Sequence, residues 1–334
     1  MTVATERLRL AQPFRISGYV FEHSDVVVVT LSDGEYQGRG EGGGVFFLGD
    51  DVAHMTSQLA EASTAIETGV TRRELRHILP PGGARNAVDC ALWELEAARS
   101  GRPVWELAGL AAPKALRTTF TLGADTPEVM AQGARNYADA KAIKIKLTGD
   151  LALDIARVRA IRAARPDAWL SVDGNQGFTA DQLDPLIAAL QAAGVALLEQ
   201  PLARDRDADL EGYRSPMPIA GDESIVSLSD IAGAVGRFNV VTIKLDKCGG
   251  LTEGLLMAAE ARKLGLGVMV GNMVGTSLAM APAFILGQLC DIVDLDSPIF
   301  LARDRTPGAV YRDGDIHVGG EVWGTRDAAD RKNL

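Results

Sequence analysis

Residues 169–173 read WLSVD, residues 196–199 read ALLE and residues 218–222 read PIAGD. Each stretch is a short apolar run that ends in an acidic residue, and an alanine-rich segment with helical spacing follows. Eight short apolar runs, these three included, occur at intervals of 23 to 27 residues. They are Thr118–Leu122, Ile143–Leu147, Trp169–Asp173, Ala196–Glu199, Pro218–Asp222, Val240–Leu245, Val268–Gly271 and Ile292–Leu295.

A repeated strand-plus-helix unit predicts an α/β fold with a (β/α)₈ barrel of modified TIM type. Parallel strands need crossover helices, and eight strands enclose an interior that side chains can fill. We expect residues 116–300 to form this catalytic barrel. Residues 1–115 are expected to form an α+β capping domain, which residues 301–334 return to complete.

The first part of the chain has a different pattern from the barrel. Val26–Leu31 is a β-branched run, and Gly38–Glu41 offers a second short strand after a turn-like segment. Helical spacing of apolar residues follows in Val52–Thr68 and Ala84–Arg99. The sequence therefore predicts an antiparallel sheet followed by helices, with further strands around Asp313-Gly314 near the end of the chain.

The composition excludes several classes of protein. The 334 residues include 34 Lys+Arg and 44 Asp+Glu, a formal charge of −10, whereas a general nucleic-acid binder needs a basic face. No apolar stretch has the length of a signal peptide or a membrane span, so we expect no membrane insertion. Three cysteines far apart in sequence, Cys90, Cys248 and Cys290, indicate a reducing compartment, and we predict a cytoplasmic protein.

The carboxyl ends of the barrel strands form the active-site face of such folds. Three consecutive predicted strands end in Asp173, Glu199 and Asp222. Three converging carboxylates would repel one another and raise one another's pKa unless a cation lay between them. An all-oxygen ligand set favours Mg²⁺ or Mn²⁺.

Lysines accompany these acids. Lys144 and Lys146 are two residues apart on the second predicted strand, so both face the barrel interior. Lys247 is expected to end the sixth strand, on the far side of the barrel mouth. One lysine on each side of a metal-held substrate could remove a proton from one face and return one to the other, although lysines that merely neutralise the acids remain an alternative.

Two more carboxylates, Asp294 and Asp296, lie on one side of the eighth predicted strand. They are too far round the barrel from the other three acids to join the same metal site. We expect a cationic group of a small-molecule substrate as their partner, with a plain solvated pair as the alternative.

Taken in order, these motifs resemble the enolase superfamily, in its muconate-lactonizing subgroup, and most of all the dipeptide epimerases such as the L-Ala-D/L-Glu epimerases. The resemblance covers nearly the whole chain. The stretches that carry it are 84–93 (ARNAVDCALW), 144–146 (KIK), 172–175 (VDGN), 199–201 (EQP), 221–224 (GDES), 244–247 (KLDK) and 294–296 (DLD).

The resemblance implies Mg²⁺ on Asp173, Glu199 and Asp222, with Lys146 and Lys247 as opposed acid/base catalysts. It places Lys144 close to the substrate carboxylate, and it implies that Asp294 and Asp296 hold the α-ammonium group of a dipeptide. The expected activity is an isomerase reaction, epimerisation by 1,1-proton transfer through a metal-stabilised enediolate. Similar proteins are often homo-oligomers.

In this family the specificity loops come from the capping domain, here Phe14–Ser24 and Gly42–Asp51. Members that act on L-Ala-D/L-Glu commonly carry an arginine in the first loop for the glutamyl carboxylate, whereas residues 17–23 of this chain read SGYVFEH, without an arginine. Tyr19, Phe21, Phe46 and Phe47 are candidates to line an apolar pocket, with Tyr19 and Phe21 as substrate-binding residues, or they are ordinary packing residues of the capping domain.

The alternatives on sequence alone are an N-acylamino acid racemase, a lyase of the cycloisomerase or succinylbenzoate-synthase kind, and a non-catalytic binding protein.

Overall fold

The computed structural model of the protein describes residues 1–324. The chain begins with an antiparallel sheet in which β1 (Thr2–Ile16) and β2 (Tyr19–Asp33) form a long hairpin and β3 (Tyr36–Gly43) pairs with β2. Strands β2 and β3 extend the two expected strands at both ends. Strand β1 is an addition to the sequence-based prediction, because most of its side chains are exposed and it has no apolar run.

Four helices follow this sheet: α1 (Val52–Glu67), α2 (Arg72–Ile78), α3 (Gly83–Ser100) and α4 (Val104–Leu107). Helices α1 and α3 agree with the two expected helices to within one residue at each end. Side-chain caps explain where two of them begin, since Asp51 accepts from the backbone of His54 and Thr71 forms a capping box with Glu74.

Helix α3 lies directly on strand β3. Gly38, Gly40 and Gly42 alternate along β3 and present one face to the helix. A Cβ atom on Gly40 would be 2.0 Å from the carbonyl oxygen of Ala87. The glycines therefore permit a backbone-to-backbone approach that any other residue would prevent.

The eight barrel strands form one parallel sheet. They are β5 (Thr119–Leu122), β6 (Ala142–Lys146), β7 (Trp169–Asp173), β8 (Val195–Glu199), β9 (Ile219–Gly221), β10 (Val240–Lys244), β11 (Gly267–Gly271) and β12 (Ile292–Val293). Their order in the sheet is their order in the chain. The prediction of a capped, modified (β/α)₈ barrel is confirmed.

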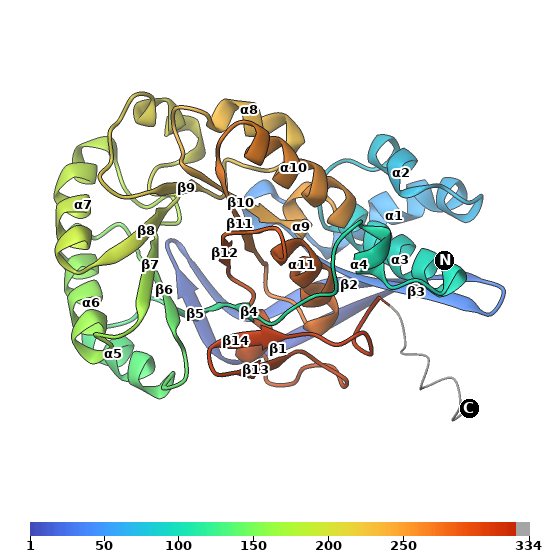
Figure 1. Ribbon diagram of the computed structural model, residues 1–334, viewed down its shortest axis with the longest axis horizontal. Helices are drawn as coiled ribbons and strands as arrows, with labels where there is room; N and C mark the ends of the chain where they lie inside the picture. Colours follow the sequence, from blue (N-terminus) through green and yellow to red (C-terminus); the bar gives the residue numbers. More distant parts are fainter. Residues whose placement is uncertain (325–334) are drawn as a thin grey trace.

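Helices cover the outside of this sheet (Figure 1). They are α5 (Pro127–Asn136), α6 (Leu151–Ala164), α7 (Leu183–Ala192), α8 (Ile231–Ala234), α10 (Leu251–Lys263) and α11 (Ser277–Gly287). The short helix α9 (Leu245–Cys248) follows β10 directly and packs against α3. Two expected helices are replaced, because the segment after β12 forms the 3₁₀ helix η5 (Ser297–Phe300) and the segment after β8 forms the 3₁₀ helix η3 (Arg204–Leu210). The charged and turn-forming residues of that segment lack an apolar stripe that a longer helix would bury.

The edge strands β5 and β12 are joined by side chains rather than by a ladder of backbone hydrogen bonds within the described chain. Thr119 Oγ1 donates to Asp294 Oδ1 at 2.5 Å, and the Thr121 amide donates to Asp296 Oδ2 at 2.5 Å. The Leu295 amide donates to Thr118 Oγ1 at 2.9 Å. We call this junction the seam of the barrel.

The C-terminal segment crosses back over both parts of the protein. Strands β13 (Val310–Arg312) and β14 (Asp315–His317) form a hairpin around Asp313-Gly314, as expected. The hairpin pairs with β4 (Leu116–Arg117) and not with the β1–β3 sheet. Contacts to the first sheet come from residues before and after the hairpin, since Leu301 bridges Leu10 and Trp323 Nε1 donates to the Arg39 carbonyl. Residues 325–334 of the expected tail lie outside the described residues.

Two apolar cores support this arrangement. One fills the space between the barrel sheet and its helices, and the other lies between the β1–β3 sheet and helices α1 to α3. Within residues 1–324, every helix is too short or too polar to cross a membrane.

Candidate active site

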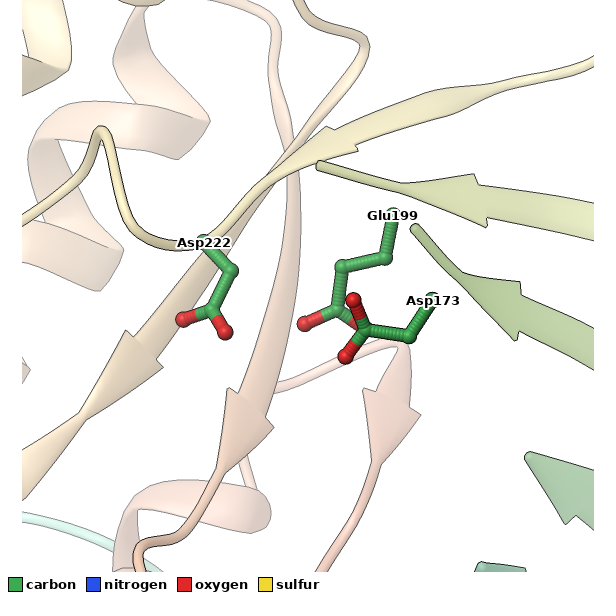
Figure 2. Close-up of side chains that lie close together, drawn as sticks. All are labelled: Asp173, Glu199 and Asp222. Atoms are coloured by element: carbon green, nitrogen blue, oxygen red, sulfur yellow. The ribbon is translucent and has the colours of Figure 1, made fainter. Parts of the chain in front are cut away.

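The three predicted metal ligands meet at the carboxyl ends of adjacent strands. Asp173 ends β7, Glu199 ends β8 and Asp222 directly follows β9. Their carboxyl groups gather in one place at the barrel mouth (Figure 2). One carboxylate oxygen from each residue lies within 4.8 Å of the other two, and each residue is at most 1% exposed.

The lack of hydrogen bonds within residues 1–324 to the buried Glu199 carboxylate fits a metal site. Neither of its carboxylate oxygens has a hydrogen bond of ordinary geometry among the described residues, although Lys144 Nζ is 2.8 Å from Oε2. A buried carboxylate in this condition is costly unless a cation binds it. Because all three donors are carboxylate oxygens, the set matches the preference of Mg²⁺.

The electrostatics of the three acids differ. Burial would raise the pKa of Asp173, but the ammonium groups of Lys146 and Lys144 lower it to about 2. Burial, together with the charges of Asp173 and Asp222, raises the pKa of Glu199 to about 8. Glu199 is therefore the member of the set that most needs a positive charge beside it.

Both lysines of β6 point into the barrel, as their two-residue spacing predicts. Lys144 is 1% exposed, and its Nζ lies 2.8 Å from Asp294 Oδ2 and 3.1 Å from Asp173 Oδ2. Lys146 lies two residues closer to the carboxyl end of β6, and its Nζ is 2.6 Å from Asp173 Oδ2. Lys144 thus connects the metal-type cluster with the carboxylates at the seam.

The lysine opposite Lys146 is Lys244, which corrects the expected placement of Lys247. Strand β10 ends at Lys244, and the chain then turns into helix α9. Strands β6 and β10 are four places apart in the eight-stranded order, so their lysines lie on opposite sides of the mouth. Lys146 contacts Asp173, and Lys244 Nζ lies 2.7 Å from Asp222 Oδ2, so each lysine flanks one end of the acidic cluster.

Lys247 has a different environment. It lies on α9, is 1% exposed, and its Nζ donates to Asp222 Oδ1 at 2.6 Å and to the carbonyl groups of Asp222 and Thr242. Burial lowers its pKa, a direction that suits a base, yet its side chain is fully buried, whereas those of Lys146 and Lys244 are 10% and 9% exposed. The hydrogen bonds of Lys247 hold the Asp222 side chain in place.

Asp294 and Asp296 lie at the seam, side by side across from β5. Asp294 is already paired with Lys144 and Thr119. Burial, with the charge of Asp294, raises the pKa of Asp296 to about 7. The structure thus brings these two carboxylates next to Lys144, at one end of the same cluster.

A cavity of about 270 Å³ extends from the lysine pair to the capping domain. Lys146, Lys244 and Phe21 line it, whereas Lys247 and Tyr19 do not. Tyr19 instead packs against Phe46, with 4.6 Å between ring centroids.

Two further polar residues at this cavity were missed in the sequence analysis. Asn175 Nδ2 donates to Glu223 Oε1 at 3.2 Å, and neither Asn175 Oδ1 nor Glu223 Oε2 has a hydrogen-bond partner among the described residues. Their positions in the sequence could have identified them, since each follows a predicted metal ligand by one or two residues.

Family models match both parts of the chain. The mandelate racemase / muconate lactonizing enzyme N-terminal domain matches residues 1–109, and the enolase C-terminal domain-like model matches residues 129–320. The chain belongs to the enolase superfamily. This membership confirms the resemblance, with dipeptide epimerases among the most similar proteins.

Two relatives illustrate the range of activities in this part of the enolase superfamily. The L-Ala-D/L-Glu epimerase of Escherichia coli is 40% identical over 318 residues, which cover 95% of this chain and 98% of the relative. The N-acetyl-D-glutamate racemase of a Pseudoalteromonas species is 36% identical over 311 residues, which cover 92% of this chain and 97% of the relative.

Solved structures of the superfamily give the same picture. An enolase family member from Agrobacterium tumefaciens, described by its homology to dipeptide epimerases and solved with sodium and L-Ala-L-Glu, has a TM-score of 0.93 and 40% identity over 97% of this chain and 99% of its own. A dipeptide epimerase from Methylococcus capsulatus, solved with Mg and L-Arg-D-Lys, has a TM-score of 0.87 and 28% identity over 95% of this chain and 96% of its own.

Proposed function

We propose that this protein is a Mg²⁺-dependent dipeptide epimerase that inverts one α-carbon by 1,1-proton transfer. The observation that carries the proposal is the pair Lys146 and Lys244, which line one cavity from opposite sides of a buried three-carboxylate cluster. The similarity to dipeptide epimerases over nearly the whole chain supports the same reaction.

Each side chain has a separate role in this proposal. Asp173, Glu199 and Asp222 would hold Mg²⁺, which would supply positive charge to offset the negative charge that develops on the substrate carboxylate. Lys144 lies next to the same cluster and is assigned to that carboxylate. Asp294 and Asp296 are assigned to the α-ammonium group.

The proton transfer itself is assigned to Lys146 and Lys244. In one direction the neutral amine of Lys146 takes the α-proton, and the ammonium group of Lys244 delivers a proton to the opposite face. The roles exchange in the reverse direction. The contacts with Asp173 and Asp222 hold both amines close to the acidic cluster, where the substrate carbon must lie.

A racemase of N-acylamino acids is the second candidate. Asp294 is already paired with Lys144 and Thr119, so it does not require a cationic substrate group. An N-acylamino acid keeps the carboxylate and the acidic α-proton but has no ammonium group. Alanine replacement of Asp294 and Asp296 should therefore reduce dipeptide turnover much more than N-acylamino acid turnover. The cycloisomerase and synthase alternatives predict a cyclised or dehydrated product instead.

The test is deuterium incorporation measured by mass spectrometry. The protein is incubated in D₂O with Mg²⁺ and a panel of dipeptides and N-acylamino acids, and we expect a gain of one mass unit at a single α-carbon of a dipeptide. Lys146→Ala and Lys244→Ala should each abolish inversion. Each should also retain exchange from only one epimer, because the remaining lysine reaches only one face.

Lys263→Ala is the matched control, since Lys263 is exposed and lies on the outer helix α10. If Lys244→Ala exchanged both epimers at the rate of the unchanged protein, Lys244 would not be the second base. If no compound of the panel took up deuterium, the epimerase proposal would fail.

Several broader predictions stay part of this proposal. We propose the domain division 1–115, 116–300 and 301–334, a cytoplasmic location and a homo-oligomeric state. The three cysteines are all free, which supports a reducing compartment. The charge of −10 speaks against nucleic acid as a partner.

A further inference from the structure

The far end of the cavity is built from aromatic side chains of two separate segments. Phe21 comes from β2, and Phe46 and Phe47 come from η1 (Phe46–Leu48). The ring centroids of Phe21 and Phe46 are 5.2 Å apart, and those of Phe46 and Phe47 are 5.4 Å apart. We call these three rings, with Tyr19 behind Phe46, the aromatic cluster.

Other apolar side chains continue the wall between the aromatic cluster and the lysines. They are Phe14, Ile16, Val52, Met273 and Val274. Burial of an apolar group against such a surface is favourable, whereas burial of a charged group there is unfavourable because no partner offsets its lost hydration.

The charged groups at this end of the cavity are mostly acidic. Asp25, Asp50 and Asp51 line it together with His23. Asp25 is bound by Arg7 at 2.8 Å, and Asp51 caps helix α1.

No arginine is among the described residues that line this cavity. The guanidinium group of Arg204 lies over a ring of the aromatic cluster, with its Cζ 5.8 Å from the centre of the Phe47 ring. Arg204 is exposed and does not line the cavity. A carboxylate on a substrate side chain would thus meet three acids and no arginine inside the cavity.

We propose that the side chain on the epimerised carbon is apolar, and that the aromatic cluster binds it. This inference rests on the proposed function and names the substrate class. The carbon between Lys146 and Lys244 lies at one end of the cavity, so the side chain it carries leads toward the cluster at the other end. L-Ala-L-Phe and L-Ala-L-Leu represent the preferred class, and L-Ala-L-Glu represents the disfavoured one.

The test compares kcat/KM for these three dipeptides, followed by circular dichroism at the epimerised centre. We expect the apolar dipeptides to be used roughly tenfold to a hundredfold better than L-Ala-L-Glu, because a buried Leu or Phe side chain gains that factor over an exposed one. Phe21→Arg should reverse the preference. Phe46→Ala should lower kcat/KM for the apolar dipeptides and leave that for L-Ala-L-Glu nearly unchanged.

Two controls separate the possible outcomes. Tyr36→Ala removes an exposed aromatic residue outside the cavity and should change none of these ratios. Arg204→Gln tests the outer cation, and it too should leave the ratios unchanged.

A higher kcat/KM for L-Ala-L-Glu in the unchanged protein would overturn the inference and leave the epimerase proposal standing. Absence of deuterium uptake from every dipeptide would instead overturn the proposed function, and the inference with it. The comparison in the unchanged protein decides the matter even if Phe21→Arg fails to fold.

Discussion

The replacement of Asp246 by asparagine tests how the capping domain is fastened to the strand that carries Lys244. Asp246 lies on α9 and is 5% exposed. Its Oδ1 accepts from the Gly43 amide and from Asn86 Nδ2, both at 2.8 Å. Because both bonds use one oxygen, an asparagine can keep both while it removes the buried charge.

The magnitude follows from the pKa of this carboxyl group. Burial raises the pKa of Asp246 from 3.8 to about 6. A group whose pKa is higher in the folded state contributes fully below its unfolded pKa and loses that contribution as the pH rises through the folded value. The stability of the unchanged protein should therefore fall, through this group alone, by about 1.4 kcal/mol between pH 5 and pH 8.

Asp246→Asn lacks this titration, so its stability relative to the unchanged protein should rise by the same amount over that range. Asp246→Ala should be destabilised at every pH by about 2–6 kcal/mol, since it leaves the Gly43 and Asn86 donors unpaired. Chemical unfolding at pH 5, 6, 7 and 8 measures both, and Asp313→Asn serves as the exposed control. A difference between Asp246→Asn and the unchanged protein that did not vary with pH would refute the reasoning.

Three further predictions concern the metal, the barrel and the cap. Glu199→Gln keeps the shape of a ligand but removes its charge, and isothermal titration should show Mg²⁺ binding weakened at least tenfold. Lys247→Met removes one of two lysine partners of the buried Asp222 carboxylate, and because Lys244 remains, the unfolding free energy should fall by about 1–3 kcal/mol. Gly40→Ala forces a Cβ against the Ala87 carbonyl, so the melting temperature should fall by several degrees, while Gly233→Ala, at a position with open space and an ordinary φ, serves as its control.

The barrel and its cluster of three carboxylates could be predicted because the apolar runs that mark the strands also mark the strand ends that meet in the folded barrel. Buried parallel strands are short apolar runs, and the residue that ends each run lies at the shared mouth of the barrel. This reasoning found Asp173, Glu199 and Asp222 without knowledge of the closed structure. It works because the chemistry of those strand ends is independent of the exact strand length.

The second lysine shows where such reasoning fails. The apolar run in residues 240–245 continues through Leu245, so its pattern alone does not show that the strand stops at Lys244. The alternation of Thr242 and Lys244 around the buried Ile243 was the available signal, since it matches the pattern of Lys144 and Lys146 on β6. The members of the aromatic cluster could be named as candidates from the two capping-domain loops, but which of them reach the cavity could not be predicted, because they meet only when the first hairpin and η1 fold together.

The seam of the barrel joins substrate recognition to the dynamics of the sheet. Thr119 and Thr121 are held by the same two carboxylates, Asp294 and Asp296, that the proposed function assigns to an ammonium group. A ligand that occupies these oxygens must share them with the seam. Ligand binding at Asp294 and Asp296 would therefore also change the hydrogen bonds that join β5 to β12. The rate of hydrogen exchange at the Thr121 amide would then report whether the ligand is bound, although this backbone group takes no part in the chemistry.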